Sequence, residues 1–150
     1  MRAARVPLAL VGGPLMAGDL GLFDLIERCG GEVVLDATES GELSLPRPFE
    51  RRRLEDDPIG ELADAYFGSL PGVFRRPDAE LFRWLRERLA ERGARGMIVR
   101  HYIWCDLWHA AAGRLAEWGE VPVLNVQVDA EEHDSARLSG RIQAFVEMLR

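Results

Sequence analysis

The sequence has no lysine, only two cysteines and no long apolar run, and each shortage limits what the protein can be. No stretch approaches the roughly 20 apolar residues that cross a bilayer, so we expect no membrane-spanning segment and no membrane partner. Two cysteines without a secretory segment indicate a reducing compartment, and we expect a cytoplasmic protein. The basic residues are all arginine, which we attribute to genomic base composition rather than to function.

The charge balance excludes a general nucleic-acid binder. The formal net charge is −6 and the pI is near 5.1, so the chain has no basic excess for phosphate contacts. The one basic cluster, residues 51–53, is followed at once by Glu55, Asp56 and Asp57, which is typical of a solvated face. At 150 residues and 47% hydrophobic, the chain can bury the core of one domain, and we expect a single domain over residues 1–150.

Alternating strand and helix patterns predict an α/β protein. Short apolar runs predict strands over residues 6–11, 32–35, about 97–104 and 121–126, with a polar loop over 36–41. Helical spacing predicts helices that begin near Asp19 as a cap, near Pro77, near Asp106 and before Leu138. Short right-handed crossovers favour the strand order 2-1-3-4. We therefore expect a flavodoxin-like, doubly wound sheet of four parallel strands with helices on both faces.

Residues 42–57 show no period of 2 or 3.6. We expect an irregular connection there that shields the sheet edge or a partner surface. Asp57 and Pro58 then begin a helix as its cap and its first residue. Its apolar residues follow helical spacing and are Ile59, Leu62, Ala63, Tyr66 and Phe67.

Cys105 is the residue best placed for chemistry. It follows the central apolar strand and precedes a helix, and ligands of open parallel sheets bind at the carboxyl ends of the strands. A thiolate is favoured at a helix amino terminus, as a metal ligand or nucleophile requires. With this strand order, Gly12, Gly13 and Pro14 and the Trp104-Cys105-Asp106 segment should face one cleft. The glycine turn lacks the spacing of a dinucleotide fingerprint or P-loop, although its backbone N–H groups could face an anion.

Two other chemistries use the same segment. His101, Cys105 and His109 are spaced four apart and would share one face of a continuous helix, as zinc ligands often do. Because His101 lies in the predicted strand, we expect it to point elsewhere, and two ligands do not make a stable site. A Cys-His-Asp nucleophile that uses Asp106 is the other arrangement, and no oxyanion-hole signature accompanies it.

Polar residues after the other strands are further candidates for the cleft. They are Asp36, Thr38, Glu39 and Asp129. Such residues also serve as helix caps and Asx-turns, which is the simpler interpretation of each.

Several motifs occur along the chain in a fixed order. They are Gly12-Gly13-Pro14, Gly30-Gly31-Glu32-Val33-Val34, Ala65-Tyr66-Phe67, Gly96-Met97-Ile98, Trp104-Cys105-Asp106, Val121-Pro122-Val123-Leu124 and, as the most specific, Arg141-Ile142-Gln143-Ala144-Phe145-Val146-Glu147-Met148-Leu149. Through these motifs the chain resembles the carboxyl-terminal domain of the 2-hydroxyacyl-CoA dehydratase D-component family. That family also contains the two homologous subunits of ATP-dependent benzoyl-CoA reductase.

The resemblance implies a site. In that family each subunit holds a four-iron-four-sulfur cluster through three cysteines, and an activator ATPase injects the electron that begins elimination of water from a 2-hydroxyacyl-CoA. The aromatic-Cys-Asp motif carries one ligand, which implies that Cys105 is a metal ligand. The other two ligands belong to an amino-terminal domain that is not in this sequence. The resemblance also implies that two loops border the cluster and an acyl-CoA cleft, namely Gly12 and Gly13, and Thr38, Glu39 and Ser40.

One thiolate cannot hold such a cluster. We therefore expect an iron–sulfur cluster only if another chain completes it, and otherwise no cofactor. The chain is then a split subunit that pairs with an amino-terminal half or homologous subunit, a degenerate or accessory member, or the product of a truncated gene. The first functional hypothesis is part of a dehydratase or benzoyl-CoA reductase type subunit that is inactive alone. The second is a non-catalytic interaction or CoA-binding module, and neither assigns a catalytic residue.

Overall fold

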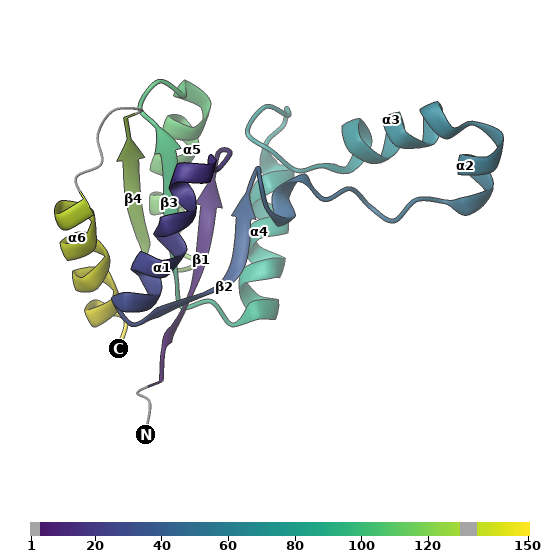
Figure 1. Cartoon of the computed structure of the whole chain (residues 1–150). Helices are drawn as coiled ribbons and strands as arrows, with labels where there is room; N and C mark the ends of the chain where they lie inside the picture. Colours follow the sequence, from purple (N-terminus) through teal and green to yellow (C-terminus); the bar gives the residue numbers. More distant parts are fainter. Residues whose placement is uncertain (1–3, 130–134) are drawn as a thin grey trace.

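A computed structural model describes residues 4–129 and 135–150, and its centre is a parallel sheet of four strands (Figure 1). The strands are β1 (Val6–Gly12), β2 (Gly31–Thr38), β3 (Gly96–Tyr102) and β4 (Val123–Val128). Their order is β2-β1-β3-β4, which confirms the predicted order 2-1-3-4. The fold is therefore the doubly wound, flavodoxin-like arrangement that the sequence predicts.

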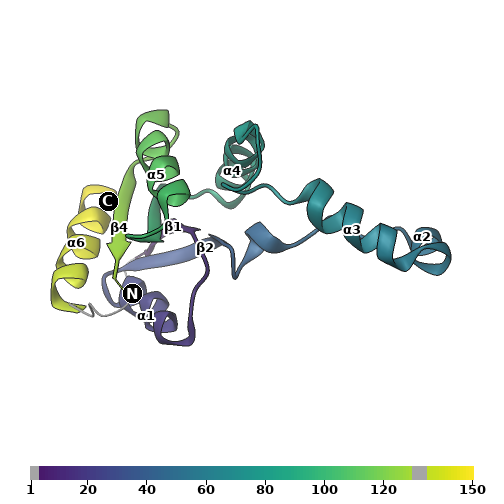
Figure 2. The same ribbon diagram turned by 90° about the horizontal axis from the view of Figure 1, so that it is seen from above.

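Helices cover both faces of this sheet (Figure 2). One face carries α1 (Gly21–Arg28) and α6 (Ser135–Met148), and the other carries α4 (Ala79–Arg92) and α5 (Asp106–Trp118). Successive side chains of β3 enter alternate layers: Met97 and Val99 pack with α4 and α5, whereas Ile98 packs with α1 and α6. Because both faces of β3 are buried, its sequence is an apolar run rather than an alternation of apolar and polar residues.

The helices on the sheet begin and end close to their sequence signals. Leu81, Leu85 and Leu89 form the buried stripe of α4, which ends at Gly93 with a φ of +62°, the left-handed conformation that favours glycine. The predicted apolar side of the last helix is confirmed, because its residues at positions 142, 145 and 149 are buried. No helix in the described ranges is both long and apolar enough to cross a membrane.

Two local predictions are wrong. Residues 36–38, which were expected to begin a polar loop, belong to β2 instead. Asp36 and Thr38 pair with Leu10 and Gly12 of β1 and so extend the strand. Asp19 does not cap α1. It lies in a 3₁₀ turn, η1 (Ala17–Leu20), where its carboxylate accepts the backbone N–H of Met16 at 2.7 Å.

The connection between β2 and α4 forms an arm that projects sideways from the sheet (Figures 1 and 2). It contains a 3₁₀ turn, η2 (Glu42–Ser44), and the helices α2 (Arg51–Asp56) and α3 (Pro58–Ser69). The prediction that residues 42–57 are irregular is therefore wrong for α2, since six residues are too few to show a helical period. The predicted start of α3 is confirmed: Asp57 Oδ1 accepts the backbone N–H of Gly60 at 3.0 Å, and Pro58 is the first residue.

A buried carboxylate holds the arm together. Glu61 of α3 accepts two hydrogen bonds from the Arg47 guanidinium, at 2.7 and 3.0 Å, and one from the backbone N–H of Glu50 at 2.8 Å. Arg53 of α2 adds an ion pair at 3.2 Å. The hydrogen bonds from Arg47 and then Glu50 lower the pKa of the Glu61 carboxyl from 4.5 to about 2. The arm is thus built around charge-assisted hydrogen bonds rather than an apolar core.

Candidate functional site

The loops that follow β1 and β2 meet the start of α5 at the carboxyl edge of the sheet. Trp108 of α5 is buried there, and its indole N–H donates to Glu39 Oε1 at 2.7 Å. The same ring lies against Gly13, and the backbone N–H of Glu39 donates to the carbonyl of Gly12 at 3.0 Å. Trp108 thus joins the start of α5 to the loops after β1 and β2. That the glycine turn and the Trp104-Cys105-Asp106 segment face one cleft stays a prediction.

Gly12 is required by the close approach of β1 and β3. Its φ is +148°, and a Cβ at this position would lie 1.8 Å from the carbonyl oxygen of Arg100. Any side chain would therefore push two central strands apart, since they pair directly at this point. The glycine turn thus has a structural cause that is independent of any anion.

The polar groups of the β2 loop are largely used within the fold. Thr38 is fully buried, and both its backbone N–H and its hydroxyl donate to Asp36 Oδ1, at 3.1 and 2.7 Å. Ser40 Oγ accepts the backbone N–H of Leu15 at 2.9 Å. These contacts fix the loop as an Asx-turn does, and they bind it to the loop after β1. A ligand-binding role for Thr38, Glu39 and Ser40 stays a prediction.

Cys105 stands directly before α5, at the carboxyl end of β3. It is half-buried against the core layer of α4 and α5. Its backbone N–H donates to the backbone carbonyl of Tyr102 at 3.0 Å, and its own carbonyl accepts the backbone N–H of His109 at 2.9 Å. The backbone of Cys105 is therefore fixed at the start of the helix. Within the described ranges, no group of three or more His, Cys, Asp or Glu side chains could hold a metal ion. The donor set of the described residues does not by itself fit a cluster.

Two histidine rings meet in a way that the sequence did not predict. His101 is fully buried and does not point away, because its ring packs edge-on against that of His109 with centroids 5.6 Å apart. The neighbours in β4 complete the group: His101 Nε2 lies 3.0 Å from Asn125 Oδ1, and His109 Nδ1 lies 2.8 Å from Gln127 Nε2. Both rings are thus engaged by amide side chains, an arrangement that fixes α5 on the sheet.

A cavity of about 510 Å³ opens on the other side of the same edge, between α1 and α6. Its apolar wall includes Leu22, Leu25, Val126 and Leu138, and its basic side chains are Arg28, Arg100, Arg137 and Arg141. It lies where the strand order reverses between β1 and β3, the usual ligand position in doubly wound sheets. Of the residues predicted for a cleft, Asp129 belongs to its lining. Cys105 and the predicted loop residues Gly12, Gly13, Thr38, Glu39 and Ser40 do not.

A buried arginine organises the cavity wall. Arg100 of β3 is almost fully buried, and it donates to Asp19 Oδ1 at 2.7 Å and to the carbonyl of Pro14 at 3.0 Å. Its guanidinium also lies over the Tyr102 ring, 4.3 Å from the centroid. These partners satisfy the buried charge and tie η1 to the sheet. The signal that could have found this site was an arginine inside an otherwise apolar strand, since arginine is seldom buried without a partner.

The sheet order and its carboxyl edge define an α/β protein of the class that binds ligands beyond the strand ends, with a thiol on one side and a basic cavity on the other. The family model for the 2-hydroxyglutaryl-CoA dehydratase D-component matches residues 2–149. The chain therefore belongs to this family, whose name describes one component of an enzyme with partner subunits. A search of curated proteins finds no match to the chain.

Proposed function

We propose that the chain is the carboxyl-terminal part of a 2-hydroxyacyl-CoA dehydratase or benzoyl-CoA reductase type subunit and is inactive alone. The observation that carries the proposal is the position of Cys105, at the carboxyl end of the central strand in a chain that matches the family over residues 2–149. In this position the sulfur lies at the edge where doubly wound sheets bind their ligands.

The remaining cluster ligands come from outside residues 1–150. One thiolate is too few for a four-iron-four-sulfur cluster, so an amino-terminal half or homologous subunit supplies the others. Such a cluster, once completed, would supply one-electron chemistry, with an activator ATPase as the electron donor. Cys105 contributes its sulfur, and the hydrogen bonds at the start of α5 hold the backbone that carries it in place.

The cavity between α1 and α6 provides the acyl-CoA cleft in this proposal. Arg28 has no hydrogen-bond or ion-pair partner within the described ranges, and Arg141 is anchored by one hydrogen bond to the carbonyl of Asn125 at 2.5 Å. Both guanidinium groups thus keep donors for the phosphates of coenzyme A. The apolar wall suits the less polar part of the ligand, and 510 Å³ is within the usual range of small-molecule sites.

The experiment that tests this proposal is the iron and acid-labile sulfide content after anaerobic reconstitution. The native chain, Cys105→Ser and Cys29→Ser are each reconstituted alone and with a cysteine-bearing amino-terminal half. Cys29 is the matched control, since its sulfur contacts Ser139 at 3.7 Å in the α1–α6 layer, away from the β3 edge. We expect iron only with the partner, lost in Cys105→Ser and kept in Cys29→Ser. Iron that persists in Cys105→Ser contradicts the assignment.

The alternative function is a non-catalytic interaction or CoA-binding module. The donor set favours it, because no group of three or more His, Cys, Asp or Glu side chains in the described ranges could hold a metal ion. This alternative predicts no iron under any of these conditions, together with binding of coenzyme A by the native chain. The iron content separates the two functions, and isothermal titration with coenzyme A, compared between the native chain and Arg141→Ala, tests the cavity that both functions assign to the coenzyme.

A further inference from the structure

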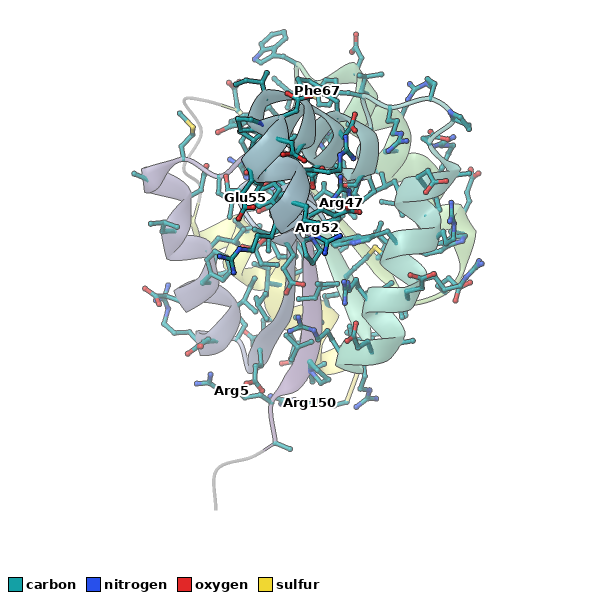
Figure 3. All side chains as sticks on the ribbon, turned by 90° about the vertical axis from the view of Figure 1, so that its right-hand side faces the viewer. Arg5, Arg47, Arg52, Glu55, Phe67 and Arg150 are labelled. Atoms are coloured by element: carbon teal, nitrogen blue, oxygen red, sulfur yellow. The ribbon has the colours of Figure 1, made fainter. Side chains whose placement is uncertain are left out.

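The outer face of α3 carries an apolar stripe that stays largely exposed among the described residues, apart from the contact of Tyr66 with Phe49, whose ring centroids are 6.3 Å apart. Phe67 and Ile59 are 88% and 75% exposed, and Leu62, Ala63 and Tyr66 are exposed between them. Their positions follow the i, i+3, i+4, i+7, i+8 spacing of one helix face. Viewed along the arm, Phe67 lies on the side away from Arg47 and Arg52 (Figure 3). The face that the sequence marks as buried is therefore the exposed one.

The arm itself leaves no room for this stripe inside. The buried residues of α3 are Glu61 and Ala65, on the opposite face, and Glu61 is fixed there by Arg47, Arg53 and the backbone of Glu50. Turning α3 to bury the stripe would expose the carboxylate and break these bonds. The stripe can therefore be covered only from outside the arm.

The stripe is complementary to itself. Ala63, the smallest member, is at its centre, and the two most exposed side chains, Ile59 and Phe67, are each four residues away. In an antiparallel pair of α3 helices with a two-fold axis at Ala63, Ile59 of one copy faces Phe67 of the other, twice. The small central residue lets the two helices approach closely, and both large contacts are formed by the same symmetry operation.

The area is sufficient for a specific dimer. At these exposures, with about 150–200 Å² for a large side chain, each stripe leaves roughly 400 Å² of apolar surface in water. Two stripes together give about 800 Å², and since about 57% of an interface is apolar, the full contact would bury roughly 1,400 Å². This lies within the usual range of about 1,200–2,000 Å² for specific interfaces.

We propose that two copies of this chain associate through their arms, with the α3 helices packed antiparallel about a two-fold axis at Ala63. Because the arm projects away from the sheet, the two sheets then lie at opposite ends of the helix pair (Figure 1). The association is independent of the proposed catalytic role and leaves the carboxyl edge around Cys105 accessible to a different partner.

Sedimentation equilibrium from about 1 to 300 µM tests the association. We expect a dimer with a dissociation constant in the micromolar range, weakened at least tenfold by Phe67→Ser. Met148→Ser is the matched control, because Met148 is 63% exposed on α6 and outside the stripe, and it should leave the constant unchanged. Both side chains are exposed, so neither change should unfold the protein. A chain that stays monomeric throughout this range overturns the proposal and leaves the stripe to a different protein.

Disulfide trapping tests the geometry. In a Cys29→Ser, Cys105→Ser background, Ala63→Cys should give a covalent dimer on mild oxidation, because the two-fold axis brings the two sulfurs together. Gly68→Cys is the control on the same helix, since Gly68 is exposed but lies opposite the stripe. Equal trapping of both variants, or a dimer that Ala63→Cys does not trap, overturns the antiparallel arrangement.

Discussion

Replacing Gly12 by alanine should be severely destabilising, because the new Cβ would clash with β3 and would also strain the backbone at Gly12. The new Cβ would lie 1.8 Å from the Arg100 carbonyl oxygen, and real Cβ contacts essentially never come under 3.0 Å, so β1 and β3 must separate in the middle of the sheet. Overpacking of this kind costs about 1–3 kcal/mol. A φ of +148° in a residue with a side chain costs about another 1–3 kcal/mol.

The expected loss is therefore about 2–6 kcal/mol, a substantial part of the 5–15 kcal/mol that stabilises a typical domain. At about 2–4 °C per kcal/mol, the melting temperature should fall by roughly 4–24 °C in a calorimetric or circular-dichroism melt. Gly113→Ala is the control, because nothing lies within 4 Å of its Cβ position in α5, and it should be neutral or stabilising by about 0.5–1 kcal/mol. Equal melting temperatures for Gly12→Ala and the native chain would refute the close approach of β1 and β3.

Two further predictions concern the arm and the core. Because the pKa of Glu61 is lowered from 4.5 to about 2, its contribution to arm stability is fully present above pH 4.5 and is lost as the pH falls toward 2. The protection factors of the amides in α2 and α3, taken against the intrinsic exchange rate at each pH, should fall over that range in the native chain, whereas in Glu61→Gln they should be low already at pH 7. Protection factors in the native arm that are the same at pH 2 as at pH 7 would contradict this. In the core, Leu85→Ala should cost about 2–5 kcal/mol in urea unfolding, because Leu85 of α4 is fully buried in the core layer against the sheet. Met148→Ala, at an exposed position, should stay within about 0.5 kcal/mol, and similar costs for the two would be inconsistent with the described core.

The strands and helices that form the layers could be predicted from the sequence, because burial gives each of them a characteristic pattern of apolar residues. The apolar run of β3, the stripe of Leu81, Leu85 and Leu89, and the glycine that ends α4 are local signals, and each is where the pattern placed it. The strand order followed from the handedness of short crossovers rather than from any single residue. Cys105 at the strand end was found in the same way, from an apolar run followed by a helix start.

The contacts between segments that are distant in the chain could not be predicted from the sequence. Trp108 joins α5 to Glu39, 69 residues away in the chain, and Arg100 finds Asp19 at a separation of 81. His101 meets His109 because a strand and the following helix fold back on each other, which simple helical spacing does not describe. A sequence gives the residue types for such pairs, but only the packing of the layers brings the partners together.

The sequence by itself determined the α/β class, the strand order, the position of Cys105 and the amphipathic pattern of α3, because these depend on local periodicity and on chain connectivity. Only the tertiary structure decided which side of each pattern is buried. In α3 the burial of Glu61 by Arg47 and Arg53 turns the apolar stripe outward, and at the carboxyl edge the pairing of Arg100 with Asp19 forms the wall of a cavity. In both places charge pairing between segments remote in sequence, which no local pattern encodes, sets the surface that the protein presents.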